Sequence, residues 1–263
     1  MSTNIDLYEM MTMKEWFTKF KKIDAHSHIG TFGSPFHIDF DETRLLEQMK
    51  AFRIEKTILC AADCHSTEDV NLVYKKHPEQ IIPLVWTNAS EGKIAYDMLE
   101  HYLRDEGFAG AKLQSLFDGY TVDAPCVDPV MELARHYKKP IFIHCGHPPF
   151  SLPWQIGLLA KRHPDVPIVM IHMGHGHGVY IEGSVNTALE YDNLYLECSG
   201  MPMGSWIKAA YEQVGSNRIM FGIDSPFHDP SVEIQRVMTC GLDDKALQDV
   251  FYNNAAKFMG IIN

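Results

Sequence analysis

Two histidines separated by one residue lie in the stretch Lys22 to Gly30, and their spacing suits the binding of a metal ion. If this stretch is a β-strand, His26 and His28 point to the same face, so their imidazoles can converge on one ion. Two unrelated histidines near a turn would give the same pattern. Because a catalytic zinc ion needs about three protein ligands and an open position, the hypothesis depends on whether later strands end in further ligands.

The elements that could position such ligands recur along the chain. Counting from Ile23, eight strand-like apolar runs are each followed by a segment with helical spacing, at intervals of about 25–30 residues. After the first, the runs are residues 56–63, 80–88, 108–114, 140–146, 166–174, 193–200 and 218–226. This alternation predicts a parallel sheet, and eight units predict an α/β fold of the (β/α)8 TIM-barrel type. An open doubly wound sheet is the alternative, but its first turn is usually rich in glycine, whereas this one carries histidines.

The sequence shows no linker and no shift in composition, so residues 1–263 are predicted to form a single domain. Residues 1–21 are predicted to be a helical extension that packs its apolar positions across the bottom of the barrel. Residues 243–263 are predicted to form a closing helix. The metal site should then lie at the opposite end, where the carboxyl ends of the strands meet.

Composition argues against several classes of partner. The formal net charge is -11 and the basic residues are scattered, so a nucleic-acid partner is not expected. No apolar run approaches the length of a membrane span, and the N-terminus lacks the basic-then-apolar order of a signal peptide. The six cysteines show no tight CxxC spacing, which predicts a reduced, cytoplasmic protein. We expect a small-molecule substrate, and exposed apolar residues of the N-terminal helix could serve a homodimer.

Residues with metal-binding chemistry end several of the predicted strands. Lys112 and Gln114 end the fourth run, His144 the fifth, His172 the sixth and Asp224 the eighth. Carboxyl ends of barrel strands gather at one face, where active sites lie. A nitrogen-rich site with one carboxylate suits Zn²⁺ first and Mn²⁺ or Fe²⁺ second. The set that would form it is His26, His28, His144, His172 and Asp224.

The ordered motifs at these strand ends resemble the amidohydrolase superfamily. The similarity is to its amidohydrolase-2 type metal-dependent TIM-barrel hydrolases, the branch that includes aminocarboxymuconate-semialdehyde decarboxylase. It spans nearly the whole chain and rests on Asp24-Ala25-His26-Ser27-His28, Gly110-Ala111-Lys112-Leu113, Ile143-His144-Cys145-Gly146, Ile171-His172-Met173-Gly174, Phe221-Gly222-Ile223-Asp224-Ser225-Pro226 and residues 254–260. The resemblance implies one catalytic divalent metal held by His26, His28, His144 and Asp224. By the same resemblance, His172 either binds a second metal or contacts the substrate and the metal-bound water.

Three roles stay open for Lys112. In binuclear members of the superfamily a lysine at this strand is carboxylated and bridges two metals, so a second metal is expected if Lys112 is modified in this way. The residue could instead be a free ammonium that anchors an anionic substrate, or it could pair with a nearby carboxylate. Burial beside a cation would lower the pKa of the lysine and make carboxylation feasible.

The reaction expected first is hydrolysis of a small amide, ester or lactone by a metal-activated water. Asp224 would take a proton from that water, and His172 would stabilise the oxyanion or deliver a proton. Non-oxidative decarboxylation, or hydration, of a small unsaturated or aromatic acid is the alternative. Carboxy-lyases usually hold the carboxylate by arginine, and the arginines here fall on helices or at the wrong end of the barrel. A non-catalytic metal-binding barrel is the second alternative and would need a closed coordination shell.

Residues that follow the predicted strands could form the wall of a substrate pocket. His175 stands in the glycine-rich run Gly174 to Gly178, where the backbone could approach a ligand closely. The candidate substrate contacts are Lys112, Phe32, His65, Trp86, His147, His175 and Phe227. If these side chains line the site, the substrate is small, partly apolar or aromatic, and uncharged or singly anionic.

Overall fold

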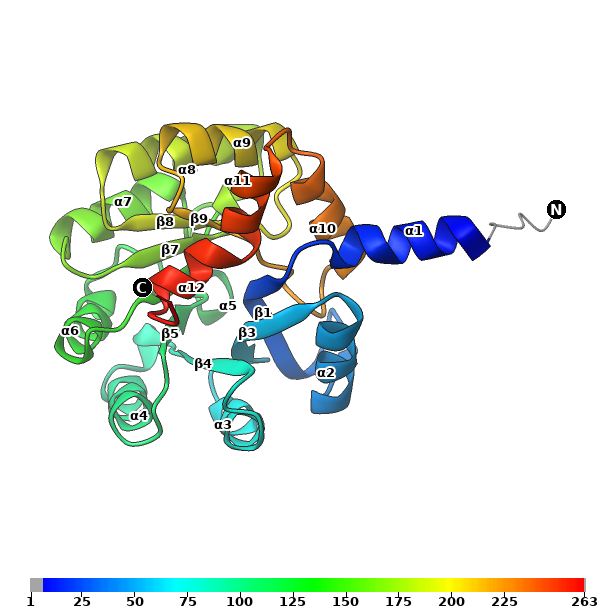
Figure 1. Cartoon of the computed structure of the whole chain (residues 1–263). Coiled ribbons are helices and arrows are strands. Elements are labelled where there is room, and N and C mark those ends of the chain that lie inside the picture. Colours follow the sequence, from blue (N-terminus) through cyan, green and yellow to red (C-terminus); the bar gives the residue numbers. More distant parts are fainter. Residues whose placement is uncertain (1–6, 263) are drawn as a thin grey trace.

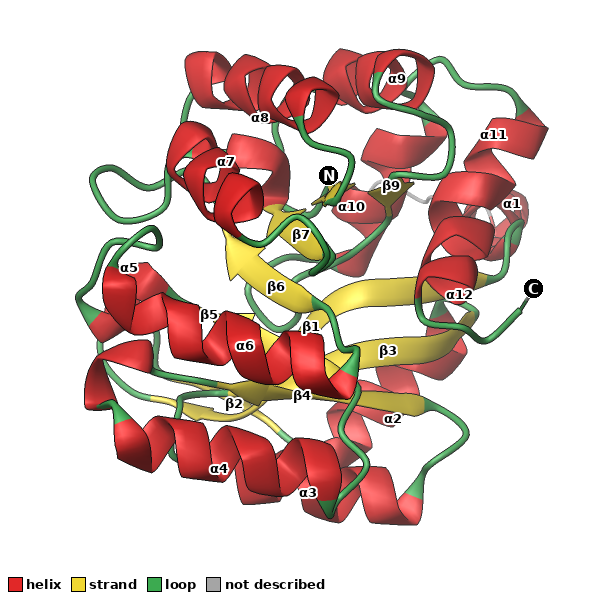
Figure 2. Ribbon diagram, turned by 90° about the vertical axis from the view of Figure 1, so that its left-hand side faces the viewer, coloured by secondary structure: helices red, strands yellow, loops and turns green. Residues whose placement is uncertain are grey.

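The computed structural model describes residues 7–262 and shows parallel strands surrounded by helices (Figures 1 and 2). The sheet has nine strands in the order β2-β1-β3-β4-β5-β6-β7-β8-β9. The strands are β1 (Lys22–Phe32), β2 (Ile38–Phe40), β3 (Ile54–Ala61), β4 (Ile81–Trp86), β5 (Gly110–Leu113), β6 (Ile141–His144), β7 (Ile168–Ile171), β8 (Leu194–Glu197) and β9 (Ile219–Met220). β2 is a short antiparallel addition to β1, and every other neighbouring pair is parallel, so the eight predicted strands are confirmed.

A helix follows nearly every strand and covers the outside of the sheet (Figure 2). The α-helices are α1 (Leu7–Thr18), α2 (Glu42–Ala51), α3 (Thr67–Lys76), α4 (Lys93–Arg104), α5 (Ser115–Asp118), α6 (Asp128–Tyr137), α7 (Pro153–Arg162), α8 (Gly178–Glu190), α9 (Gly204–Gln213), α10 (Pro230–Met238), α11 (Asp244–Gln248) and α12 (Asn254–Phe258). Short helical turns are η1 (Ala89–Glu91), η2 (Pro125–Val127), η3 (His172–Gly174) and η4 (Asp249–Asn253). Among the described residues, no helix combines the length and the apolar character that crossing a membrane requires.

Backbone hydrogen bonds between β1 and the segment that continues β9 close the barrel. The N–H of Ala25 donates to the carbonyl of Phe221 at 2.9 Å, and the N–H of His28 donates to the carbonyl of Ser225 at 2.7 Å. The N–H of Asp224 donates to the carbonyl of His26 at 2.7 Å. The first and last strands of the alternation therefore lie side by side, and the closure itself brings both histidines of β1 next to Asp224.

The parallel strands are apolar on both faces because both faces are buried. One set of side chains fills the inside of the barrel: Ile23, Ala25, Ile58, Cys60, Leu84, Phe142, Val169, Ile171 and Met220. The other set packs against the surrounding helices in a larger cluster, with members such as Leu59, Val85 and Ile143. A filled interior leaves the substrate site to the strand ends and loops.

The C-terminal segment plugs the amino end of the barrel. Tyr252, Ala255 and Ala256 belong to the cluster inside the barrel, so this segment completes the interior core. The predicted closing helix consists of three joined pieces, α11, η4 and α12, and η4 is a π-helical turn (red in Figure 1).

The N-terminal extension contacts the barrel at its end, where Phe20 is buried in the core and its ring stacks on that of Phe251 in η4, 5.6 Å away between centroids. α1 points away from the barrel (Figure 1), and Trp16 is 40% exposed. Its indole Nε1 donates to Oε1 of Gln235 on α10 at 2.8 Å. Residues 1–6 of the predicted extension lie outside the described residues.

A buried lysine ties the start of β1 to two neighbouring turns. Nζ of Lys22 donates to the carbonyls of Phe17 and Phe20 at 2.7 Å each and to that of Phe52 at 3.0 Å. Lys22 is 1% exposed, so replacing it would leave these carbonyls without their donor. We expect Lys22→Met to lower the free energy of unfolding by about 2–4 kcal/mol in urea denaturation. Lys19→Met, which removes an exposed ion pair with Asp244, is the control and should cost less than about 1 kcal/mol. Equal losses in the two variants would contradict this role.

Candidate metal and active site

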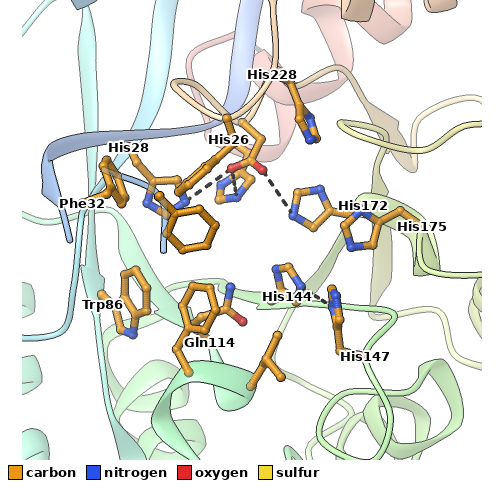
Figure 3. Close-up of a pocket in the computed structure, with 15 residues that line it drawn as sticks. His26, His28, Phe32, Trp86, Gln114, His144, His147, His172, His175 and His228 are labelled. Atoms are coloured by element: carbon orange, nitrogen blue, oxygen red, sulfur yellow. Dashed lines mark hydrogen bonds and ion pairs between the residues drawn. The ribbon is translucent and has the colours of Figure 1, made fainter. Parts of the chain in front are cut away.

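Three histidines meet one aspartate: His26 and His28 lie on β1, His172 directly follows β7 and Asp224 follows β9. Figure 3 shows the three histidines on the wall of the site. Oδ1 of Asp224 lies 3.1 Å from Nε2 of His26 and 3.5 Å from Nε2 of His28. Oδ2 of Asp224 lies 3.8 Å from Nε2 of His172. All four side chains are buried. The site therefore has two imidazoles at one carboxylate oxygen and a third imidazole at the other.

The backbone is strained at two of these residues. His172 has φ 68° and Asp224 has φ 65°, in the left-handed region that a residue with a Cβ seldom adopts. Such strain costs about 1–3 kcal/mol and persists only where the surroundings enforce it. At His172 the N–H donates to Oε2 of Glu197 at 3.2 Å, and at Asp224 it donates to the carbonyl of His26. Strain held at two strand ends is typical of a functional site.

Hydrogen bonds to backbone carbonyls fix the tautomers of two imidazoles. Nδ1 of His28 lies 2.8 Å from the carbonyl of Ala61, and Nδ1 of His172 lies 2.9 Å from the carbonyl of Ser199. A carbonyl only accepts, so each Nδ1 carries the proton and each Nε2 has a free lone pair. This is the arrangement that orients histidine for metal binding.

Burial keeps the histidines of the site neutral. It lowers the pKa of His26 and His172 well below the usual range and that of His28 to about 3. The positive charge of Lys112 adds to the effect at all three, and its Nζ lies 3.3 Å from Nε2 of His26. Because a metal binds neutral imidazole, these residues need not lose a proton to act as ligands near neutral pH.

Three buried carboxyl groups surround the histidines, and the nearby cations are too few to balance the negative charges of these carboxyl groups. Burial raises the pKa of Asp24 and Asp224 well above the usual range and that of Glu197 to about 7. Lys112 is a buried cation whose charge lowers the pKa of Asp224, and burial lowers the pKa of Lys112 itself. A divalent ion beside Asp224 would supply the missing positive charge. The donor atoms and the charge balance both fit a divalent metal.

A second group of histidines lies on the other wall. His144 ends β6, and Nε2 of its ring lies 2.7 Å from Nδ1 of His147. One nitrogen each of His144, His147 and His175 lie within 4.8 Å of one another. The rings of His144 and His172 are 4.7 Å apart between centroids, so the two groups are neighbours. The structure thus brings together His26, His28, His172 and Asp224, and the ring of His144 lies beside that of His172 with its Nε2 close to His147.

A cavity of about 310 Å³ opens between these groups and a wall of aromatic rings. The centroid of the Phe227 ring lies 4.8 Å from that of Phe32 and 5.9 Å from that of His28. The indole of Trp86 is 5.9 Å from His28 and stacks on Phe117 at 6.3 Å. The lining residues are His26, His28, Phe32, Phe36, Trp86, Gln114, Leu116, Phe117, His144, His147, His172, His175, Asp224, Phe227 and His228.

A family model described as amidohydrolase matches residues 23–261, nearly the whole chain. The protein belongs to the amidohydrolase family. Membership makes it an enzyme and confirms the family resemblance seen in the sequence. None of the curated proteins matches the chain.

Solved structures similar to this amidohydrolase share its barrel. The 2,6-dihydroxybenzoate decarboxylase from Rhizobium has a TM-score of 0.72 and 16% identity, over 92% of this chain and 99% of that one. For 5-carboxyvanillate decarboxylase from Novosphingobium aromaticivorans, complexed with manganese and a nitrobenzoic acid, the TM-score is 0.73 at 14% identity, with 92% and 97% covered. An uncharacterized TIM-barrel protein from Bordetella bronchiseptica gives 0.73 at 17%, with 92% and 99% covered. At these identities the likeness shows the fold, and it confirms the TIM-barrel prediction.

Five of the seven predicted substrate contacts line the cavity of this amidohydrolase: Phe32, Trp86, His147, His175 and Phe227. The other two do not. The side chain of His65 is 73% exposed and lies 3.5 Å from Glu91, outside the cavity. Lys112 is fully buried beside His26, so it reaches the site from below the cavity surface.

Several residues of the site escaped sequence reasoning. Leu116 and Phe117 lie on α5, a single helical turn that the periodicity did not reveal. Glu197 was passed over although it ends the buried strand β8, the same signal that pointed to His144. Asp24 accepts from the N–H groups of His26 at 3.1 Å and Ile223 at 2.8 Å, which ties both halves of the site together. An acidic residue inside an apolar strand was the available clue.

Proposed function

We propose that this amidohydrolase is a metal-dependent, non-oxidative decarboxylase of a small aromatic or unsaturated acid. The observation that carries the proposal is the aromatic wall, which faces the histidine and aspartate group across one cavity. Phe227 and Trp86 both lie 5.9 Å from His28, so a flat ring bound against them would sit beside the metal ligands. The reactions named for the Rhizobium and Novosphingobium proteins, decarboxylation of substituted benzoates, support this substrate class.

His26, His28, His144 and Asp224 would hold the metal in this proposal, the set that the family resemblance implies. A catalytic centre keeps a coordination position open for water or substrate. When bound, the ion would act as a Lewis acid toward an oxygen of the substrate. The nitrogen donors favour zinc, and manganese is the alternative, supported by the Novosphingobium complex.

Asp224 and His172 would carry the proton that decarboxylation needs. The bond between the ring carbon and the carboxyl carbon breaks, CO₂ leaves, and the electron pair left on the ring carbon takes up one proton. With the metal at Oδ1 of Asp224, Oδ2 stays free to accept and pass on a proton. Nε2 of His172 lies 3.8 Å from Oδ2 of Asp224 and can exchange the proton with it.

The test is a substrate panel on the metal-loaded enzyme. Hydroxybenzoates and unsaturated acids labelled with ¹³C at the carboxyl group report decarboxylation as labelled CO₂. Esters, lactones and amides of similar size report hydrolysis. We expect labelled CO₂ from at least one hydroxybenzoate, lost after chelation and restored by metal. Turnover confined to the esters, lactones or amides would overturn the proposal.

Hydrolysis of an amide, ester or lactone is the second candidate, and one observation favours it. Among the described residues, no arginine lines the cavity, so a substrate carboxylate would lack the fork that usually binds it. In that reaction Asp224 would take a proton from the attacking water, and His172 would face the developing oxyanion. Only the substrate panel distinguishes decarboxylation from hydrolysis, because both reactions use the same residues.

The aromatic wall can be tested at Phe227. Its ring contacts those of Phe32 and Phe36, at 4.8 and 5.0 Å between centroids, and it lies over the metal side of the cavity. We expect Phe227→Ala to raise KM about tenfold or more and to change kcat less, because the ring binds substrate without touching the proton. Trp154→Ala removes a half-exposed ring outside the cavity and should leave both constants unchanged. A fall in kcat alone would argue against a binding role.

A further inference from the structure

A chain of hydrogen bonds lies behind the ring of His172, on the side away from Asp224. Glu197 ends β8, Ser199 follows it by two residues, and His172 follows the neighbouring strand β7. All three side chains are buried. We infer that Glu197 and Ser199 are positioning residues, which hold the imidazole of His172 in the orientation in which it exchanges a proton with Asp224. Neither side chain lines the cavity, so both act through His172.

The hydrogen bonds of this chain run in one direction. Oγ of Ser199 lies 2.9 Å from Nδ1 of His172, which carries the proton because the carbonyl of Ser199 also accepts from it. The hydroxyl therefore accepts from His172 and is free to donate its own hydrogen to Oε2 of Glu197, 2.8 Å away. The carboxylate thus orients the hydroxyl, and the hydroxyl orients the ring.

Glu197 also holds the backbone that carries the ring. Its Oε2 accepts from the N–H of His172 at 3.2 Å, at a residue whose φ of 68° is strained. Its Oε1 accepts from the N–H of Ser199. One carboxylate therefore fixes the main chain of both residues as well as the hydroxyl between them. Its loss would release the strain at His172 and let the ring turn away from Asp224.

A glycine makes room for this carboxylate beside the segment that carries Asp224. A Cβ at Gly222, two residues before Asp224, would overlap Oε1 of Glu197. The same Cβ would lie 3.2 Å from the backbone nitrogen of His26. A larger residue at this position would push Glu197 away. The residue that positions His172 is therefore packed directly against the segments that carry Asp224 and His26.

The hydroxyl sets His172 apart from His28. Nδ1 of His28 is held by the carbonyl of Ala61, whereas Nδ1 of His172 is held by both the carbonyl and the hydroxyl of Ser199. As a metal ligand, His28 would also be fixed through its other nitrogen. Nε2 of His172 instead faces a carboxylate oxygen 3.8 Å away, too far for a hydrogen bond. The contacts behind the ring therefore set its orientation. This inference rests on the proposed proton transfer by His172, which serves decarboxylation and hydrolysis alike.

A double-mutant cycle tests the inference. With the substrate that the panel identifies, kcat and KM of the metal-loaded, full-length protein are measured for Glu197→Gln, His172→Gln and the variant that combines them. We expect Glu197→Gln to lower kcat about 10–100-fold and to change KM less than about twofold. In the His172→Gln background the same substitution should cost less than about twofold, because the ring that it positions is gone.

Ser199→Ala tests the hydroxyl separately, because it keeps the carboxylate and the carbonyl. We expect kcat to fall about 3–10-fold, and this loss should also disappear in the His172→Gln background. Ser184→Ala is the control, because it removes a buried hydroxyl on α8 that donates to the carbonyl of Tyr180 at 3.0 Å. It should leave kcat unchanged. Circular dichroism, thermal melting and metal content show that each variant is folded and holds its ion.

Nitrogen NMR gives a readout that needs no turnover. In chelator-treated protein with ¹⁵N-labelled histidine, the ring signals of His172 are those that His172→Gln removes. We expect the proton on Nδ1 to exchange with water at least about tenfold faster in Ser199→Ala and Glu197→Gln than in the wild type. Additive losses of kcat in the cycle, or unchanged exchange in both variants, would overturn the inference. Faster exchange in a protein that turns over no member of the panel would sink the proposed function and leave the positioning role standing.

Discussion

Asp224→Asn is expected to lower turnover of the metal-loaded enzyme by at least about 10³-fold, the largest effect of any single change in the site. The substitution keeps the size of the side chain but removes both its negative charge and its proton. Oδ1 would lose its attraction for an ion shared with His26 and His28, 3.1 and 3.5 Å away. Oδ2 would no longer exchange a proton with His172, 3.8 Å away.

Measuring metal content beside kcat separates the two roles of Asp224. We expect the variant to bind the catalytic ion more weakly, and to remain slow even when excess metal fills the site. Asp229→Asn is the matched control, because Asp229 caps α10 on the same loop and asparagine caps a helix equally well. It should keep full activity and metal. Activity of Asp224→Asn within about tenfold of the wild type would remove Asp224 from the reaction.

The sequence predicted the barrel well because each strand gives two signals, an apolar run and a polar residue at its end. A parallel strand buried on both faces reads as an apolar run, and a polar residue at its end faces the loops. That signal located His28, His144, His172 and Asp224 without any alignment. It did not show that α1 points away from the barrel (Figure 1), because the apolar face of a helix does not tell which surface it meets.

The sequence alone could not predict which histidines face Asp224 and which face the loop histidines. His144 and His172 both end neighbouring strands, yet Nε2 of His144 contacts His147 whereas Nε2 of His172 faces Asp224. Their side-chain directions depend on loop contacts, such as that of Gly176 with the backbone of Gly146, which bring together segments about 30 residues apart. Such contacts between distant segments produce no periodic pattern in the sequence. Lys112 was ambiguous for the same reason, since its burial decides between anchoring a substrate and contacting His26.

The acid sensitivity of the metal-free protein gives the second large effect. Burial, reinforced by the charge of Lys112, lowers the pKa of His28 to about 3 in the folded state, against an ordinary value of 6.5. Between these values the unfolded chain binds more protons, so the free energy of unfolding rises with pH and the gain is complete above 6.5. Glu197 acts in the opposite direction. Burial raises its pKa from 4.5 to about 7, so the folded state binds more protons and stability falls as pH rises through this window.

Two variants should therefore change the pH dependence with opposite signs. Between pH 4.5 and 6.5, in chelator, His28→Gln should reduce the slope of unfolding free energy against pH by up to about 1.4 kcal/mol per pH unit, one proton. Glu197→Gln should make the slope more positive by up to about the same amount. His136→Gln, at an exposed position on α6, is the control and should leave it unchanged. Urea denaturation across this pH range measures the slopes. If both variants changed the slope in the same direction, burial would not set the protonation states of His28 and Glu197.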